Sequence, residues 1–421
     1  MMYNLALFME TVKHMKILQV SGTDIIGGAG IAAYRLHQGL RQASIDCQML
    51  VARKATSDPT VHRLSPRLNR LGRLQQRYAT QQHKRQLRQN ERANDSAYWS
   101  LNNATYPIAD VINSFHADAV HIHWIGDNYL PIQQFSKINA PIIWTLHDMW
   151  AFTGGCHYSG ECTAYQHSCG NCPQLVQPQP DDISYKVLQQ KRQSWQAQPM
   201  TIVCPSQWLA DCVKESAVLA DKAVHVIPNG IDTKQFKPID MSSARQAFNL
   251  PIDKKLVLFG AFGGTTDPRK GFTYLRDALQ QLPETSDIEL VVFGADQPQN
   301  LEVNLPVHQV GRLQDTVSIA LLYAACDVFV LPSMQDNLPN TILEALACGT
   351  PCVAFDTGGI PDLIQHQANG YLAKLKDSHD LAQGIQSILE KSLPRDIIHH
   401  QIIQKYSIQQ IAEQYIQLFK P

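Results

Sequence analysis

Residues 331–362 read LPSMQDNLPNTILEALACGTPCVAFDTGGIPD, and this stretch decides the fold class. A short apolar strand, Val328–Leu331, runs into it and is followed by a polar loop. A helical pattern then opens near Asn340, a residue type that is common at helix N-caps. After a glycine, a second apolar strand covers Cys352–Phe355, and a Gly-Gly turn leads into another helix. Two strand–loop–helix units in succession predict a parallel, doubly wound α/β sheet.

Two acidic residues stand in this frame, Asp336 in the loop and Glu344 one turn inside the helix. Both are expected to face one crevice at the carboxyl edge of the sheet. Two helix N-termini at that edge favour an anionic ligand, because their free amides and the helix dipole point at it. An exposed pair of acids near a helix start is the plainer interpretation of the same spacing.

The stretch resembles the sugar-nucleotide site of family 4 glycosyltransferases. The matching pattern is Pro-Ser, an acid at 336, Glu-Ala at 344–345 and Gly-Gly-x-Pro-acid at 358–362. This family consists of retaining enzymes with the GT-B fold, in which two doubly wound Rossmann-like domains face a central cleft, so the resemblance implies that fold. The family usually has Glu at the first acidic position and a Gly-rich loop after it, where this chain has Asp336 and Pro339.

Length and composition favour a two-domain globular protein. The 421 residues exceed one usual core, and 44% apolar with 17% charged residues is typical of a folded protein. A net charge of -1 gives no general case for nucleic-acid binding. No apolar run approaches the roughly 18 residues of a spanning helix, and the chain's start lacks the basic and apolar regions of a signal peptide. A cytoplasmic location is therefore expected.

The domain boundaries follow from the same resemblance. A P-N-G-I-D turn at 228–232 matches the turn before the family's interdomain crossing and places the boundary near Pro238. In GT-B proteins a final helix returns to the first domain. The expected divisions are an extension at 1–14 that is disordered or not translated, an N-terminal acceptor-binding domain at 15–237, a C-terminal nucleotide-sugar-binding domain at 238–400, and the returning helix at 401–421.

A glycine-rich loop follows the first predicted strand. Gly28, Gly30 and Ala33 fit a loose G-x-G-x-x-A dinucleotide fingerprint, but seven residues separate Val20 from Gly28, so the first glycine misses the tight turn after the strand. This argues against a dehydrogenase. In the resembled family such a loop lies over the donor diphosphate, and glycines let backbone amides come close to a ligand. Gly28 is therefore assigned to donor binding, with a turn that holds no ligand as the alternative.

The segment 62–92 is strongly basic, with nine Lys or Arg against one acid, Glu91. Leucines and a tyrosine recur in it at helical spacing, which predicts a pair of basic amphipathic helices. A solvated helical insertion is the ordinary explanation of such a charge run. Contact with an anionic lipid surface is the alternative, since each basic residue near such a surface contributes about 1 kcal/mol. A transferase with a lipid-linked acceptor would need that contact.

Polar residues end the next two predicted strands, at 119–124 and 141–146. Alternation places His121 and His123 on one face of the first strand, where a buried core histidine is the plain interpretation of His121. His147 follows the second strand, at the edge where α/β proteins bind ligands. The resemblance also implies a His there, against the transferred sugar or the acceptor hydroxyl. His147 is therefore the catalytic candidate of this half.

Four cysteines follow in a loop at 154–173, spaced C-x5-C-x6-C-x2-C. Four thiolates that end in a C-x-x-C knuckle suit a tetrahedral structural zinc, without a catalytic role. Reduced thiols and two disulfides are the alternatives, and disulfides are the least favoured in a chain without a signal peptide. The stretch, with T-L-H-D-M-W before it, is similar to bacterial exopolysaccharide transferases of the colanic-acid type. The predicted zinc ligands are Cys156, Cys162, Cys169 and Cys172.

The second half alternates short apolar strands with helices, which again predicts a doubly wound sheet. Lys270-Gly271 matches the K-G that opens the family's first helix, whose lysine binds the donor diphosphate. The family's preceding Arg is missing here, so Arg269 is expected to substitute for it. A lysine at a helix start opposes the helix dipole, which disfavours a purely structural role. The further donor-binding residues that the resemblance implies are Arg312, Asn337, Asn340, Glu344 and Gly359.

Together these residues indicate a retaining glycosyltransferase that uses a UDP or GDP sugar and a saccharide or lipid-linked saccharide acceptor in cell-surface polysaccharide synthesis. Lys270 and the helix N-termini would stabilise the leaving diphosphate, and with no D-x-D motif in the chain no catalytic cofactor is expected. Glu344 would bind the ribose hydroxyls and Asp336 would orient the sugar. A sugar-nucleotide epimerase, a phosphorylase and a non-catalytic nucleotide-sugar-binding partner are the alternatives. The expected location is the cytoplasm, or the inner face of the plasma membrane as a peripheral protein.

Overall fold

The computed structural model describes residues 15–90, 92–93, 98–260, 267–283, 287–294 and 301–420. Contacts divide the chain into two compact units: unit 1 runs to Pro228 and resumes at Ile411, and unit 2 comprises Asn229–Gln410. The predicted boundary near Pro238 therefore falls inside unit 2. The predicted extension at 1–14 and Glu91 lie outside the described residues.

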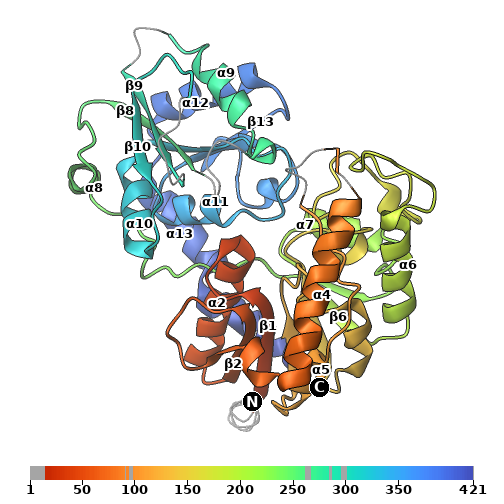
Figure 1. Ribbon diagram of the computed structural model, residues 1–421. Helices are drawn as coiled ribbons and strands as arrows, with labels where there is room; N and C mark the ends of the chain where they lie inside the picture. The colour runs from red at the N-terminus through yellow and green to blue at the C-terminus, as the bar shows by residue number, and fades with distance from the viewer. Residues whose placement is uncertain are drawn as a thin grey trace. The chain divides into compact units, whose positions relative to one another are not determined.

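Unit 1 is built on a seven-stranded parallel sheet of order β3-β2-β1-β4-β5-β6-β7 (Figure 1). The two central strands β4 and β5 are buried along their whole length, which is why they are continuous apolar runs in the sequence. The strand order reverses between β1 and β4, the place where doubly wound sheets bind ligands. The strands are β1 (Lys16–Thr23), β2 (Asp46–Arg53), β3 (Val61–Arg63), β4 (Ala119–Ile122), β5 (Ile142–Thr145), β6 (Met200–Cys204) and β7 (Ala223–Val226).

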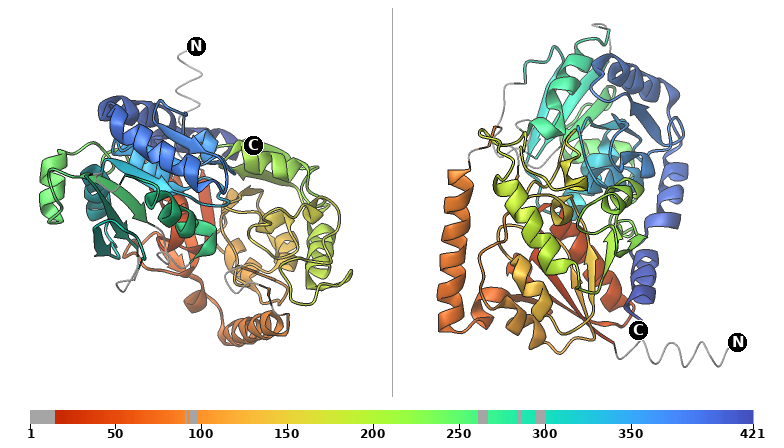
Figure 2. Two further views of the ribbon diagram at one scale, coloured as in Figure 1. Left: turned by 90° about the horizontal axis from the view of Figure 1, so that it is seen from above. Right: turned by 90° about the vertical axis from the view of Figure 1, so that its right-hand side faces the viewer.

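The basic segment 62–92 differs from the predicted helix pair. It contains edge strand β3, the short helix α3 (Leu64–Arg67) and one 20-residue helix, α4 (Arg70–Gln89). Its inward face carries Gly72, Ala79 and His83, and the helix lies at the outside of unit 1 (Figure 2). The other helices of this unit are α2 (Gly27–Gln42), α5 (Ile108–Asn113), α6 (Ile183–Trp195), α7 (Gln207–Lys214) and most of α14 (Ile408–Phe419).

Unit 2 has a six-stranded parallel sheet of order β10-β9-β8-β11-β12-β13. Every residue of β11 and β12 is buried, and helices cover both faces of the sheet. The order reverses between β8 and β11. The strands are β8 (Lys255–Gly260), β9 (Ile288–Phe293), β10 (Val307–Gly311), β11 (Val328–Leu331), β12 (Cys352–Phe355) and β13 (Gly370–Ala373). The helices are α8 (Met241–Ala247), α9 (Phe272–Leu279), α10 (Thr316–Ala325), α11 (Asn340–Ala347), α12 (Ser378–Lys391) and α13 (Arg395–Tyr406).

The end of the chain packs into the core of unit 1. Ile411, Tyr415 and Phe419 of α14 are buried against a cluster that includes Ile17 of β1 and Ile143 of β5. Because these residues recur every fourth position, one face of α14 meets the sheet. The predicted final segment 401–421 is therefore divided, with residues before Ile411 belonging to unit 2.

Candidate active site

The centre of the candidate donor site in unit 2 is an ion cluster of two cations, Lys270 and Arg269, and two carboxylates, Asp336 and Asp267. Lys270 Nζ lies 2.7 Å from Asp336 Oδ2, and a guanidinium nitrogen of Arg269 lies 3.5 Å from the same oxygen. The segments that carry them follow β8 and β11, the strands between which the sheet order reverses. Three residues that were predicted to serve the donor therefore lie together where a doubly wound sheet places its ligands.

The turn that presents Lys270 is fixed by its own residues. The Asp267 side chain accepts a hydrogen bond of 2.9 Å from the Arg269 amide and begins a 3₁₀ turn at Pro268–Lys270. Gly271 has a φ of +68°, and a Cβ there would lie 1.9 Å from the carbonyl oxygen of Pro332. The glycine of the Lys-Gly pair is therefore required by packing, whereas the lysine side chain serves the ion cluster.

Asp336 is ionised in this cluster. Burial alone would raise the pKa of Asp336, but the charges of Lys270 and Arg269 outweigh burial and hold this pKa below its usual value. The guanidinium of Arg269 also lies 3.6 Å from the Asp267 carboxylate, so the two cations are shared between two carboxylates. A diphosphate that binds here would share the two cations with Asp336.

The turn at Gly358 and Gly359 differs from its prediction. It leads into a three-residue 3₁₀ turn, Ile360–Asp362, rather than a helix. The Gly359 amide donates a hydrogen bond of 3.0 Å to the Asp336 carbonyl, so this amide is already used. A Cβ at Gly358, whose φ is +57°, would lie 2.0 Å from the same carbonyl oxygen. The two glycines hold the Asp336 loop in place, and the donor contact of Gly359 stays a prediction that its amide, already bonded, would not supply.

Glu344 lies on α11 and is largely buried, with 7% of its surface exposed. The Tyr323 hydroxyl donates a hydrogen bond of 3.3 Å to its Oε2. Asn340 is the first residue of α11 rather than its N-cap, which is Pro339. The Asn340 Oδ1 instead accepts a hydrogen bond of 3.0 Å from Asn229 Nδ2. The other predicted donor residues of this unit are Asn337, buried in the loop after β11, and Arg312, directly after β10.

Gly28 lies in the first turn of α2, which begins at Gly27. The loop before it is held by Asp24, a buried residue that was not identified from the sequence. Its carboxylate accepts hydrogen bonds from the amides of Ala55 and Thr56 at 2.9 and 2.8 Å. Burial would raise the pKa of Asp24, but these bonds outweigh it and lower the pKa below its usual value. Asp24 therefore fastens the start of α2 to the loop after β2.

A chain of buried hydrogen bonds ends at His147, after β5. Gln19 Nε2 lies 3.1 Å from His123 Nε2, and His123 Nδ1 lies 3.1 Å from His147 Nε2. The Gln19 nitrogen also faces the Ala33 carbonyl at 3.5 Å, which favours this nitrogen as the first donor. Burial lowers the pKa of His147 to about 4, so the ring is neutral at pH 7. If Gln19 donates to His123 Nε2, then His123 donates from Nδ1 to His147 Nε2. His147 Nε2 is then an acceptor, so its single ring proton is on Nδ1.

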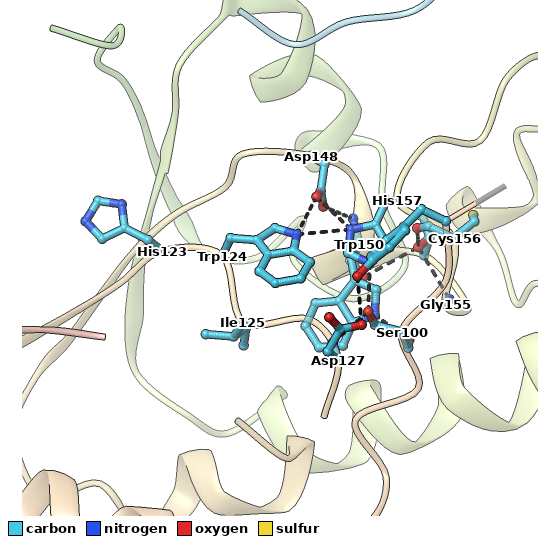
Figure 3. Close-up of polar contacts among 12 residues, drawn as sticks. Ser100, His123, Trp124, Ile125, Asp127, Asp148, Trp150, Gly155, Cys156 and His157 are labelled. Atoms are coloured by element: carbon cyan, nitrogen blue, oxygen red, sulfur yellow. Dashed lines mark hydrogen bonds and ion pairs between the residues drawn. The ribbon is translucent and has the colours of Figure 1, made fainter. Parts of the chain in front are cut away.

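A second polar network, which was not identified from the sequence, surrounds Asp148 (Figure 3). Asp148 Oδ2 lies 2.7 Å from His157 Nδ1, and His157 Nε2 lies 2.9 Å from Ser100 Oγ. The indole N–H of Trp124 donates a hydrogen bond of 3.1 Å to Asp148 Oδ2. Asp148 and His147 line the same small cavity. The only signal in the sequence was the position of Asp148, directly after the assigned histidine.

The four cysteines that were predicted to bind zinc all line one small cavity in unit 1. All ten cysteines of the chain are unpaired thiols, so this structure contains neither of the two disulfides considered from the sequence. Burial raises the pKa of Cys169 to about 12 and that of Cys172 to about 11. As the side chains lie, the described residues contain no group of three or more His, Cys, Asp or Glu that could hold a metal ion. Zinc stays a prediction.

Helix α4 presents an unusual outer face. Leu71, Leu74 and Tyr78 are exposed by 62–64% and recur at helical spacing, so they form one apolar row. The helix has six basic residues and no acidic one. Within the described part of the chain, no helix is long and apolar enough to cross a membrane.

Two family models match the chain. A model described as Glycosyltransferase Family 4 matches residues 26–235, and a model described as Glycosyl transferases group 1 matches residues 253–391. A curated relative is the N,N'-diacetylbacillosaminyl-diphospho-undecaprenol alpha-1,3-N-acetylgalactosaminyltransferase of Campylobacter jejuni, which is 29% identical over 49% of this chain and 55% of its own length. The chain spans about half the length of the curated relatives that it matches.

Solved structures have the same fold over nearly all of the chain. Sucrose-phosphate synthase from Thermosynechococcus elongatus matches with a TM-score of 0.69 at 20% identity, over 96% of this chain and 98% of that one. HepE from Anabaena, solved in complex with UDP and glucose, matches with a TM-score of 0.67 at 18% identity, over 96% of this chain and 99% of that one. The two family models and the two doubly wound units agree, and the chain belongs to the family 4 glycosyltransferases, with the GT-B fold.

Proposed function

We propose that the protein is a retaining glycosyltransferase that moves a sugar from a UDP or GDP donor to a saccharide or lipid-linked saccharide acceptor, in the synthesis of a bacterial cell-surface polysaccharide. The observation that carries this proposal is the cluster of Lys270, Arg269 and Asp336 at the reversal point of the unit 2 sheet. The complex of Anabaena HepE with UDP supports a nucleotide donor. The name of the Campylobacter relative, which specifies a diphospho-undecaprenol-linked sugar, supports a lipid-linked acceptor.

The chemistry proposed for this cluster is stabilisation of a leaving group. The reaction breaks the bond between the anomeric carbon and the diphosphate, and negative charge develops on the phosphate oxygens. Fixed positive charge stabilises that transition state, and Lys270 with Arg269 would supply it without a divalent ion. Asp336 holds both cations before the donor binds and then accepts a hydrogen bond from the donor sugar. Glu344 binds the ribose hydroxyls, a charge-assisted contact that contributes about 1.5–3 kcal/mol.

Retention follows in this scheme if the acceptor attacks from the face that the diphosphate leaves. The leaving phosphate oxygen takes the proton of the attacking hydroxyl, the new bond joins that hydroxyl's oxygen to the anomeric carbon, and no separate base is needed. Slow hydrolysis of UDP-glucose and GDP-mannose tests this without an acceptor. Proton NMR should show the first released sugar in the α configuration of its donor. Release of the β sugar, or an epimerised nucleotide sugar, would overturn the proposal.

The apolar row and the charges of α4 support peripheral attachment to an anionic membrane. Leu71, Leu74 and Tyr78 face outward, while the opposite face of the helix packs on unit 1, so the row has no role in the core. Basic residues flank the row, and the combination of exposed apolar and basic side chains is typical of helices that lie in a membrane interface. Such an attachment would hold the enzyme where lipid-linked acceptors are found.

A structural zinc on the four-cysteine cavity is also proposed. The thiol side chains would have to turn toward a common point, and binding would release their protons, because the metal ligand is the thiolate. The Lys191 amine lies nearby and is fully buried; burial lowers its pKa to about 7, while the charges of Cys156 and Cys169 raise it and favour the ammonium form. A zinc held by four thiolates carries net negative charge, which this buried cation would offset.

A further inference from the structure

Asp148 is surrounded by hydrogen bonds (Figure 3), and the donor of each can be assigned from the carboxylate outward. With a neutral His157, the Nδ1–H donates to Asp148 Oδ2 at 2.7 Å, since an ionised carboxylate only accepts. The His157 Nε2 then accepts from the Ser100 hydroxyl at 2.9 Å, and Ser100 Oγ accepts from the Asp127 amide at 3.0 Å. The Trp124 indole N–H also lies 3.3 Å from His157 Nδ1, but a protonated Nδ1 cannot accept it, so the indole donates to Asp148 Oδ2 at 3.1 Å. With these donors the imidazole of His157 is held in one tautomer and one orientation.

The order Asp–His–Ser is that of a nucleophilic triad, but a nucleophilic role does not fit Ser100. The Ser100 side chain is fully buried. A Cβ on Gly126 would lie 2.7 Å from Ser100 Oγ, so the backbone closes the space in front of the hydroxyl. The side chain of Asp148 is 13% exposed, against 4% for His157. The accessible end of the network is therefore the carboxylate of Asp148, which a ligand can reach, and the Ser100 hydroxyl is at the buried end.

Asp148 retains capacity to accept a further hydrogen bond. Its Oδ1 accepts from the Trp150 amide at 2.9 Å, and its Oδ2 accepts from His157 and from the Trp124 indole. An ionised carboxylate has about four lone-pair positions, so these three bonds leave about one. Burial would raise the pKa of Asp148, but His157 and the Trp150 amide outweigh burial and hold this pKa below its usual value. At neutral pH the carboxylate of Asp148 is therefore ionised, and its remaining lone-pair position can accept a hydrogen bond but cannot donate one.

The position of Trp124 shows that this carboxylate is held by packing as well as by charge. A Cβ on Gly22 would lie 2.8 Å from the indole ring, and a Cβ on Gly126 would lie 2.4 Å from it. The ring is therefore enclosed between two backbone segments, the end of β1 and the loop after β4. The indole N–H, like the N–H of His157, is therefore held pointing at Asp148. Such fixed donors keep the carboxylate in one orientation, as a specific binding site requires.

Asp148 and the neighbouring His147 line one cavity, and together they offer one acceptor and one donor. His147 is the neutral donor, with its proton on Nδ1. A sugar hydroxyl both donates and accepts, so this pair matches it. We propose that Asp148 accepts the hydrogen bond of the saccharide acceptor's hydroxyl group, and that His157 and Ser100 are positioning residues for Asp148. This inference rests on the proposed function, because it assigns the acceptor side of that reaction.

Saturation-transfer NMR with methyl glycosides tests the inference directly. The probes are the methyl α-glycosides of glucose, galactose and mannose, with UDP or GDP present. The wild type is expected to bind at least one of them. Asp148→Asn should weaken that binding by about tenfold to a hundredfold, the range of one charge-assisted hydrogen bond. Asp211→Asn, whose side chain is 58% exposed elsewhere in unit 1, is the matched control and should bind as the wild type does.

Two substitutions of His157 separate positioning from a general effect on folding. His157→Asn keeps an N–H near the Nδ1 position and should retain most of the glycoside binding. His157→Leu removes that N–H and should lose as much binding as Asp148→Asn. A merely structural role would lower the unfolding temperature of both variants without separating their glycoside binding. If Asp148→Asn does not fold, this pair of variants carries the test.

Nucleotide binding, measured by thermal shift in the same variants, distinguishes failure of this inference from failure of the proposed function. The variants are expected to bind UDP or GDP as the wild type does. If the wild type binds a nucleotide but no glycoside, or if Asp148→Asn binds the glycoside as tightly as the wild type, the inference is overturned and the proposed function stands. If the wild type binds no nucleotide, both are overturned.

Discussion

Asp336 and Lys270 form an ion pair of 2.7 Å in the candidate donor site, so the cation assigned to the diphosphate already has a partner. Arg269 contacts the same carboxylate oxygen at 3.5 Å. A diphosphate must therefore share these cations with Asp336. The pair keeps both positive side chains in place before a donor arrives, and it also moderates their affinity for any anion.

Replacing Asp336 with Asn should separate nucleotide binding from catalysis. The substitution removes the negative charge that competes for Lys270 and Arg269, so UDP or GDP is expected to bind at least as tightly as to the wild type. Turnover should nevertheless fall by about tenfold to a hundredfold, because the hydrogen bond to the donor sugar is weakened. Isothermal titration and initial-rate measurements check the two halves. A loss of nucleotide affinity equal to the loss of turnover would contradict this role.

The membrane hypothesis predicts that α4 binds anionic vesicles. Changing Leu71, Leu74 and Tyr78 to Ser should abolish co-sedimentation with phosphatidylglycerol vesicles, because the apolar row would no longer enter the interface. Changing Arg67, Arg70, Arg73 and Arg77 to Gln should weaken it steeply, since each basic residue contributes about 1 kcal/mol. Ile397→Ser, at a 56% exposed apolar residue of unit 2, is the control. Unchanged pelleting of the α4 variants would exclude the contact.

The zinc hypothesis predicts about one zinc per chain by elemental analysis of protein purified without chelator, as one tetrathiolate site requires. Cys169→Ala should lose the metal and unfold at a lower temperature, because a structural zinc contributes folding free energy. Cys212→Ser, which alters a partly exposed cysteine outside the cavity, should keep it. A wild-type protein that is metal-free and fully active would end the zinc hypothesis.

Unit 1 should lose stability as the pH falls. His121 is fully buried beside the Thr145 hydroxyl, and burial lowers its pKa from 6.5 to about 3. The unfolded chain therefore takes up this proton first. The contribution of His121 is intact above pH 6.5 and should fall by about 1.4 kcal/mol for each pH unit from there to the folded pKa. The buried His37, His123 and His147, whose pKa values are also lowered, add to the total slope. Urea unfolding at several pH values checks this, and His121→Gln should show a shallower slope; an equal slope would refute the assignment to His121.

The fold could be predicted largely because parallel strands buried on both faces are continuous apolar runs. The stretch 331–362 contains α11 and β12 as its spacing predicted. Two edge strands were not predicted. Strand β3 lies in the basic segment, which was interpreted as helical, and β13 begins with a glycine and has only four residues. These strands form by pairing with a neighbour, which a local pattern does not contain.

The donor site could be predicted only in part. Arg269, Lys270 and Asp336 could be grouped in advance because a motif places them in two loops at the same sheet edge, and their role in donor binding stays a prediction. The occupied amide of Gly359 could not be predicted, because its partner is a carbonyl in a different loop.

The Asp148 network was missed for a similar reason. Ser100, Trp124 and His157 come from three separate segments, and only folding brings their polar atoms to one carboxylate. Their positions in the sequence do not form a recognisable motif.

Titration of UDP and GDP into Lys270→Ala tests most directly whether this lysine binds the donor diphosphate. Lys405→Ala, at an exposed lysine of the same unit, is the matched control. One of the two nucleotides should bind the wild type and the control equally, and should bind Lys270→Ala at least about tenfold more weakly, with turnover lower by about 10²–10³-fold. Unchanged affinity together with full turnover in Lys270→Ala would contradict the account.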